Sequence, residues 1–198
     1  QRRMAARGFV VWGTDEIGMA TGDILSVSQA LGDLSGFPKV ADRLQQGLLN
    51  ELYLARLMIH PRGLVSKAAF RVDPDAPDPD DVPGGDGDMT VPANSPLDQK
   101  VRAWYRGISQ GGIMGGALMA LAPDFDRGAL GVAGMNYSVL LTRSGAWGNM
   151  YGNFFNPYYT NELERQLSLS LVQMLWDRGE PNGYAHRITT NPLPDTPE

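Results

Sequence analysis

One pentapeptide constrains the fold of this chain more than any other stretch: residues 107–111 read G-x-S-x-G. The motif directly follows an apolar, β-rich segment at residues 101–106, and it directly precedes a small-residue helix pattern at residues 112–121. A serine on such a tight strand-to-helix turn adopts a strained backbone conformation that lifts its hydroxyl clear of the sheet. We therefore predict that Ser109 is a nucleophile.

Three glycines near this serine fit the turn. Gly107 and Gly111 occupy the two positions that must be small, and Gly112 adds room for close packing of the helix on the sheet. A flexible glycine-rich turn with an incidental serine is the alternative, and the flanking segments argue against it. A phosphate-binding loop over residues 107–116 is a further alternative, but the segment has neither the G-K-[ST] ending of a P-loop nor a G-x-G-x-x-G pattern.

The segment 105–116 resembles the nucleophile elbow of the α/β-hydrolase superfamily, in the G-x-S-Q-G-G form common among bacterial serine esterases. Residues 8–15 resemble the strand that precedes the elbow strand in that fold, and residues 128–136 resemble the strand that follows the elbow helix. The resemblance covers about residues 8–140. It implies part of an α/β-hydrolase fold, with a mostly parallel sheet flanked by helices.

Size and composition limit the class of protein. The chain has 198 residues, of which 42% are hydrophobic and 20% charged, as in ordinary globular domains. No apolar run approaches the roughly 18 residues that span a bilayer. The net charge of −5 argues against nucleic acid as a main partner. Cysteine is absent, which excludes disulfides and thiolate chemistry.

The resemblance divides the chain into two parts. Residues 1–140 correspond to the central part of the hydrolase core, and residues 141–198 to a cap-like loop and helix followed by a tail. Residues 137–159 are rich in Gly, Asn and aromatic side chains. In α/β-hydrolases, insertions at this point commonly form a cap over the active site. The same aromatic side chains can equally anchor a long loop to the domain.

Residues 73–98 differ from the rest of the chain because aspartates alternate with prolines and glycines. Alternating aspartates suit a calcium loop, since they supply hard oxygen ligands. The segment has no twelve-residue loop with a closing glutamate, and its prolines limit how the chain can wrap an ion. We predict a solvated, mobile surface insertion instead.

The hydrophobic pattern predicts the remaining elements. We expect strands at residues 9–12 and 129–133, and helices at residues 24–34 and 40–59. A last helix begins at Asn161, and its predicted apolar face consists of Leu163, Leu167, Leu171, Met174 and Leu175.

A serine nucleophile needs a base, usually histidine, that a carboxylate orients. In α/β-hydrolases these groups follow the serine in the order acid, then histidine. The chain has two histidines. His60 precedes Ser109 and is interpreted as a helix terminator, whereas His186 follows it in a loop and is a candidate base or pocket residue. Asp177 lies in a predicted helix and Asp195 in a proline-rich tail, so neither is assigned as the acid.

We therefore expect the acid and the base beyond residue 198, so that the chain is a fragment lacking both ends and inactive by itself. The oxyanion hole leads to the same expectation. One donor is the backbone N–H of Gln110, at the N-terminus of a helix whose dipole favours negative charge. The second donor normally comes from the loop after an earlier strand, which would precede residue 1.

The sequence thus predicts a serine hydrolase that cleaves a small-molecule carboxylic ester through an acyl-enzyme at Ser109. A peptidase or amidase of the same fold is the near alternative. A non-catalytic hydrolase-like module, which has the elbow glycines without the triad, is the alternative from another class. The sequence pattern indicates no cofactor and no metal.

Overall fold

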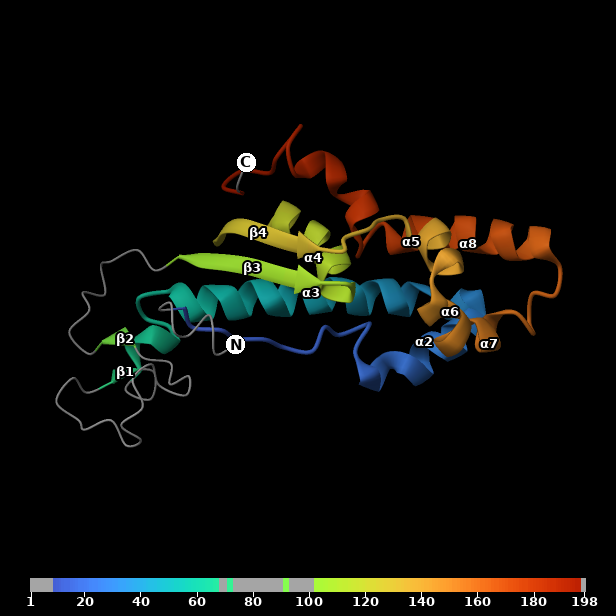
Figure 1. Ribbon diagram of the computed structural model, residues 1–198, viewed down its shortest axis with the longest axis horizontal. Helices are drawn as coiled ribbons and strands as arrows, with labels where there is room; N and C mark the ends of the chain where they lie inside the picture. Colours follow the sequence, from blue (N-terminus) through green and yellow to red (C-terminus); the bar gives the residue numbers. More distant parts are fainter. Residues whose placement is uncertain (1–8, 68–70, 73–90, 93–101, 197–198) are drawn as a thin grey trace. The chain divides into compact units, whose positions relative to one another are not determined.

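The structure is a computed structural model that describes residues 9–67, 71–72, 91–92 and 102–196 (Figure 1). The chain forms two compact units. The first comprises residues 1–14 and 53–102, and the second comprises residues 15–52 and 103–198. Helix α3 (Pro38–Ile59) contributes its last turns to the first unit and the rest to the second.

The first unit contains little regular structure in its described residues. A 3-10 turn, η3 (Leu64–Ser66), follows α3, and two short strands, β1 (Arg71–Val72) and β2 (Val91–Pro92), pair in parallel. The strand predicted at residues 9–12 is wrong, because these residues are irregular. An apolar run becomes a strand only when a neighbouring strand completes its hydrogen bonds, and the described strands pair only with one another. Apart from β2, the predicted insertion at 73–98 lies outside the described residues.

The second unit is built on a β-α-β arrangement. Strand β3 (Ala103–Ile108) leads through Ser109 into α4 (Gln110–Leu121), and the chain returns as β4 (Phe125–Gly131). The two strands are parallel and lie side by side, with α4 packed against both (Figure 1). The predicted mixture of helices and parallel strands is therefore confirmed, although the described sheet has two strands. Strand β4 begins earlier than the predicted 129–133.

The helices before the sheet follow the predicted pattern. Helix α2 (Ile24–Gly32) and the turn η2 (Leu34–Gly36) cover the first predicted helix, and α3 covers the second. The turn η1 (Thr21–Asp23) precedes α2 and carries a buried carboxylate. Asp23 accepts hydrogen bonds from the N–H of Gly18 at 2.7 Å and from Arg43 Nε at 2.8 Å. Burial acts to raise the pKa of Asp23, but these hydrogen bonds outweigh it and lower the pKa, so the charged side chain links the loop to α3.

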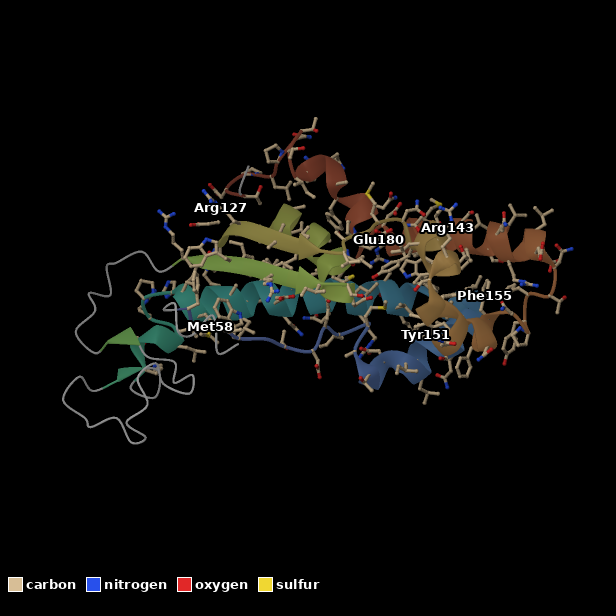
Figure 2. The ribbon with its side chains drawn as sticks, viewed as in Figure 1. Met58, Arg127, Arg143, Tyr151, Phe155 and Glu180 are labelled. Atoms are coloured by element: carbon tan, nitrogen blue, oxygen red, sulfur yellow. The ribbon has the colours of Figure 1, made fainter. Side chains whose placement is uncertain are left out.

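The aromatic segment predicted as a loop at residues 137–159 is helical. It forms α5 (Tyr137–Leu140), η5 (Leu141–Arg143), α6 (Gly145–Met150) and α7 (Gly152–Phe155). Phe155, labelled in Figure 2, is buried between Trp147 and Tyr159, with ring centroids 5.8 Å and 4.7 Å away. Because α7 also packs against α2, the aromatic cluster anchors this segment to the second unit.

Helix α8 (Glu162–Trp176) begins where predicted, and Asn161 Oδ1 caps it by accepting the N–H of Leu163 at 2.8 Å. Its predicted apolar face is wrong. The buried residues are Leu169, Val172, Gln173 and Trp176, whereas Leu163, Leu167, Leu171 and Met174 are exposed. Packing selects the other face because Trp176 contacts Phe37 edge-on, with ring centroids 4.8 Å apart. None of the described helices is long and apolar enough to cross a membrane.

A buried carboxylate joins the end of α8 to the start of α5. Glu180 is fully buried just before the turn η6 (Pro181–Gly183), and Figure 2 shows it near the ends of β3 and β4. It accepts the N–H groups of Asn136 and Tyr137 at 3.1 and 3.2 Å, the N–H of Asn182 at 2.9 Å, and Gln173 Nε2 at 2.5 Å. Asn136 and Tyr137 are distant from Glu180 in sequence, whereas Gln173 on α8 and Asn182 on η6 are close to it on either side.

We expect Glu180→Ala to lower the free energy of unfolding by at least about 3 kcal/mol, because it leaves several buried donors without an acceptor. Urea denaturation followed by tryptophan fluorescence measures the loss. Glu164→Ala, at an exposed position in the first turn of α8, is the control and is expected to lose less than about 1 kcal/mol. Equal losses in the two variants would contradict a special role for Glu180.

Candidate active site

Ser109 lies directly between β3 and α4, with no intervening residue. Its backbone angles are φ 56° and ψ −118°, a combination outside the left-handed helical region and strained for any residue with a side chain. Its N–H donates to the carbonyl of Gly131 on β4 at 3.0 Å, and its carbonyl accepts the N–H of Ile113 at 2.9 Å. The residue is exposed. The turn therefore presents a serine at the N-terminus of a helix while both of its backbone groups are satisfied.

Two glycines allow this turn by close backbone contact. A Cβ on Gly107 would lie 2.1 Å from the carbonyl oxygen of Gly111, and a Cβ on Gly112 would lie 2.3 Å from the carbonyl oxygen of Gly131. No side chain fits at either position without moving the backbone. At Gly111 itself, a Cβ would meet only the Tyr105 hydroxyl, at the ordinary contact distance of 3.5 Å.

Tyr105 fills the space that the glycines leave beneath the turn. Its hydroxyl donates to the carbonyl of Gly111 at 2.7 Å, and a Cβ on Gly115 would lie 2.3 Å from its ring. Burial raises the pKa of Tyr105, with the carboxylates of Glu51 and Glu16 adding to the effect. The phenol therefore remains protonated and keeps donating. Sequence reasoning missed this role, since a tyrosine on a strand is ordinarily a packing residue.

Gln110 connects the turn to α5 through its side chain. Its Nε2 donates to the hydroxyl of Tyr137 at 3.0 Å, and that hydroxyl lies 3.5 Å from the sulfur of Met114. The backbone of Tyr137 is in turn held by Glu180. As the first residue of α4, Gln110 has a backbone N–H with no acceptor inside the helix. That N–H is available to an anion bound beside Ser109.

Two half-buried carboxylates of the second unit, Glu16 and Glu51, lie near these tyrosines. Glu16 Oε1 is buried without a hydrogen-bond partner among the described residues, and the Glu16 side chain lies against Gly47 of α3. Desolvation raises the pKa of Glu16 to about 8, and the nearby Glu51 adds to the rise. Desolvation likewise raises the pKa of Glu51. Sequence reasoning missed both residues, because isolated glutamates are most often solvated.

The structure does not bring a base to Ser109 within its described residues. His186 is exposed on the turn η7 (Ala185–Arg187), which packs against α4, and it makes no hydrogen bond to the serine hydroxyl. His60 belongs to the first unit, where its Nδ1 accepts the N–H of Arg62 at 3.1 Å. Asp177 accepts the side-chain amides of Gln173 and Asn182 at the end of α8, which is a structural role.

Large apolar side chains are exposed at the same strand ends as Ser109. Ile108 precedes the serine and is 56% exposed, and Val132, which follows β4, is 82% exposed. Val132 also has a φ of 53°, an outlier for a β-branched residue. Met135 is 55% exposed in the segment between β4 and α5. No group of three or more His, Asp or Glu side chains in the described ranges is arranged to hold a metal ion.

Comparison with known proteins does not assign the chain to a family. No protein-family model matches the chain, and neither a curated protein nor a solved structure matches it. The arguments about function therefore depend on the geometry around Ser109.

A matched pair of alanine variants tests the close contact at the turn. Gly107→Ala should lower the free energy of unfolding by about 3 kcal/mol or more, because its Cβ would overlap a backbone carbonyl. Gly111→Ala should stay within about 1 kcal/mol of wild type, since there is room for a methyl group and alanine favours the helix. Chemical denaturation of both variants measures the difference. A Gly111→Ala variant as unstable as Gly107→Ala would refute the assignment of the contact.

Glu16 predicts a pH dependence of stability. Because its pKa is raised to about 8 in the folded state, the stabilisation from the neutral form is complete below about pH 4.5 and is lost as pH rises through 8. Glu16→Gln mimics the protonated form, so its free energy of unfolding should fall less than that of wild type between about pH 5 and pH 8. Urea denaturation at each pH measures how the free energy of unfolding of each protein changes with pH. Glu162→Gln, at an exposed position on α8, is the control and should show the same pH dependence as wild type. A wild-type pH dependence in Glu16→Gln would contradict the prediction.

Proposed function

We propose that this chain carries the nucleophile of a serine hydrolase that cleaves carboxylic esters through an acyl-enzyme at Ser109. The observation that carries the proposal is the strained backbone of an exposed serine placed directly between a strand and a helix. This is the geometry that an acyl-transfer nucleophile needs, because it lifts the hydroxyl off the sheet and sets it at a helix N-terminus. The proposed fold is correspondingly that of an α/β-hydrolase, of which β3, α4 and β4 form the central unit.

The reaction follows from the groups around the serine. The Ser109 hydroxyl oxygen attacks the ester carbonyl carbon while a base takes its proton, and the carbonyl oxygen becomes an oxyanion. The backbone N–H of Gln110 donates to that oxyanion, and the dipole of α4 stabilises it further. The tetrahedral intermediate collapses, the alcohol leaves with a proton from the base, and the acyl group remains on Ser109. Water then repeats the sequence and releases the acid.

The base and its acid are proposed to come from residues other than the described ones. Neither His60 nor His186 hydrogen-bonds Ser109, and the chain has no third histidine. A serine hydroxyl is too weak a nucleophile without such a base. The proposal therefore assigns to this chain the nucleophile and one oxyanion donor.

The exposed apolar side chains at the strand ends favour an ester with an apolar group. Ile108 and Val132 would lose contact with water when such a group binds beside Ser109. A peptidase or amidase would use the same nucleophile, and a non-catalytic module would retain the turn without turnover. The apolar surroundings favour an esterase over a peptidase or amidase. The strain at Ser109 favours an enzyme over a non-catalytic module.

A fluorophosphonate probe tests the nucleophile in the full-length protein. We expect covalent labelling of wild type and none of Ser109→Ala, because the probe phosphonylates an activated serine. Intact-mass spectrometry measures the adduct. Ser170→Ala, an exposed serine on α8, should label like wild type. Labelling that survives Ser109→Ala, or no labelling of a folded wild-type protein, would refute the proposal.

Turnover distinguishes the remaining alternatives. The unlabelled wild-type protein should hydrolyse p-nitrophenyl esters, and it should prefer a butyrate or hexanoate to an acetate if the apolar side chains contact the acyl group. Hydrolysis of the corresponding p-nitroanilide at a comparable rate would favour the amidase. Labelling without turnover of any of these substrates would leave Ser109 as a reactive serine and reject the esterase.

A further inference from the structure

Four residues other than glycine have a positive φ in the described parts of the chain. Two of them, Asn136 and Asp195, belong to residue types that tolerate this conformation. The other two, Ser109 and Val132, do not, and valine tolerates it least because its branched Cβ crowds the backbone. With a φ of 53°, the backbone of Val132 is strained in the way that residues at functional sites often are.

The two strained residues are neighbours across the pair of strands. Ile108 pairs with Gly131 at the ends of β3 and β4, so Ser109 and Val132 each follow directly after a paired position (Figure 1). The N–H of Ser109 donates to the carbonyl of Gly131 at 3.0 Å, which ties the serine to the residue before Val132. The strain is therefore concentrated at the carboxyl ends of two parallel strands, which is where ligands bind to open sheets of this kind.

Packing within the structure does not offset the strain at Val132. Its side chain is 82% exposed, more than any other large apolar side chain that the structure describes. Ile108 is 56% exposed and lies beside it, because a Cβ on Gly131 would be 3.3 Å from Ile108 Cγ1. Two exposed apolar side chains thus stand next to the candidate nucleophile, one on each strand end.

We propose that Val132 determines the acyl-group preference of the enzyme, by forming with Ile108 an apolar surface that binds the acyl chain beside Ser109. The inference rests on the proposed function, because it assigns a substrate subsite to the same nucleophile. The acyl group is the part of the ester that stays bonded to the serine oxygen through both half-reactions. It is therefore the part of the substrate that side chains this close to Ser109 contact throughout the reaction.

The residue type at position 132 fits this role. Glycine would adopt the same backbone without strain, but it would offer the acyl chain no apolar surface. Valine gives up that stability and gains an apolar contact, since each methylene that leaves water raises kcat/KM by up to about fourfold. A residue that lowers stability and serves binding is a recurrent feature of active sites.

Two fluorophosphonates that differ only in the alkyl group on phosphorus, methyl and hexyl, test this subsite in the full-length protein. The Ser109 oxygen displaces fluoride from phosphorus, and intact-mass spectrometry gives the labelling rate constant for each probe. Wild type should react faster with the hexyl probe. Val132→Gly and Val132→Asn should lower the hexyl-to-methyl rate ratio by about fourfold, because neither offers an apolar side chain to the hexyl group. Leu25→Ala removes a leucine that is 70% exposed on α2, and it should keep the wild-type ratio.

Urea denaturation of the same variants separates substrate binding from packing. Val132→Gly should be at least as stable as wild type, since glycine relieves the strain at a φ of 53°. If wild type is labelled and neither Val132 variant changes the rate ratio, the inference is overturned while the assignment of the nucleophile stands. A less stable Val132→Gly with the wild-type ratio would show a packing role and overturn it as well. A folded wild type that neither probe labels would reject the proposed function, and this inference with it.

Discussion

The structure depends on one region of close backbone contact, in which the first turn of α4 touches the ends of both β3 and β4. There is no room for a side chain at Gly107, which meets the carbonyl of Gly111, or at Gly112, which meets the carbonyl of Gly131. This contact sets how α4 lies on both strands, and it forces Ser109 into its strained conformation. The position of the candidate nucleophile is thus a consequence of backbone packing, and the side chains around it serve to hold that packing in place.

The support comes from buried polar groups on distant segments. Tyr105 holds the carbonyl of Gly111 from below, and Tyr137 receives the side chain of Gln110. The backbone of Tyr137 is fixed by Glu180, which also binds Gln173 of α8. A strained backbone conformation persists only when the surrounding interactions hold it in place. The buried Glu180 carboxylate, with its four donors, is a rigid part of those surroundings. The last helix and the turn at Ser109 are therefore mechanically connected.

Local patterns predicted the parts of this structure that local physics determines. The strand-serine-helix turn follows from its glycines, and α8 begins at Glu162 because Asn161 caps it. The sequence could not show which face of α8 is buried, since both faces are apolar and the contact with Phe37 comes from elsewhere in the chain. It also could not identify Glu180 as an anchor, because the same residue type is usually solvated. The apolar run at residues 9–12 is irregular because a strand forms only where a neighbouring strand completes its hydrogen bonds, and the described strands pair only with one another.

The identity of the residue at the turn is itself an argument for chemistry. A backbone with φ 56° and ψ −118° costs about 1–3 kcal/mol for a residue with a side chain, whereas glycine adopts positive φ at no steric cost. Glycine occurs 24 times in this chain and occupies the tight positions on both sides of the turn, yet residue 109 is serine. Packing alone would favour a glycine there. We therefore propose that the chemistry of the hydroxyl offsets the strain, because an exposed hydroxyl at a helix N-terminus can act as a nucleophile beside a donor for the charge that it creates.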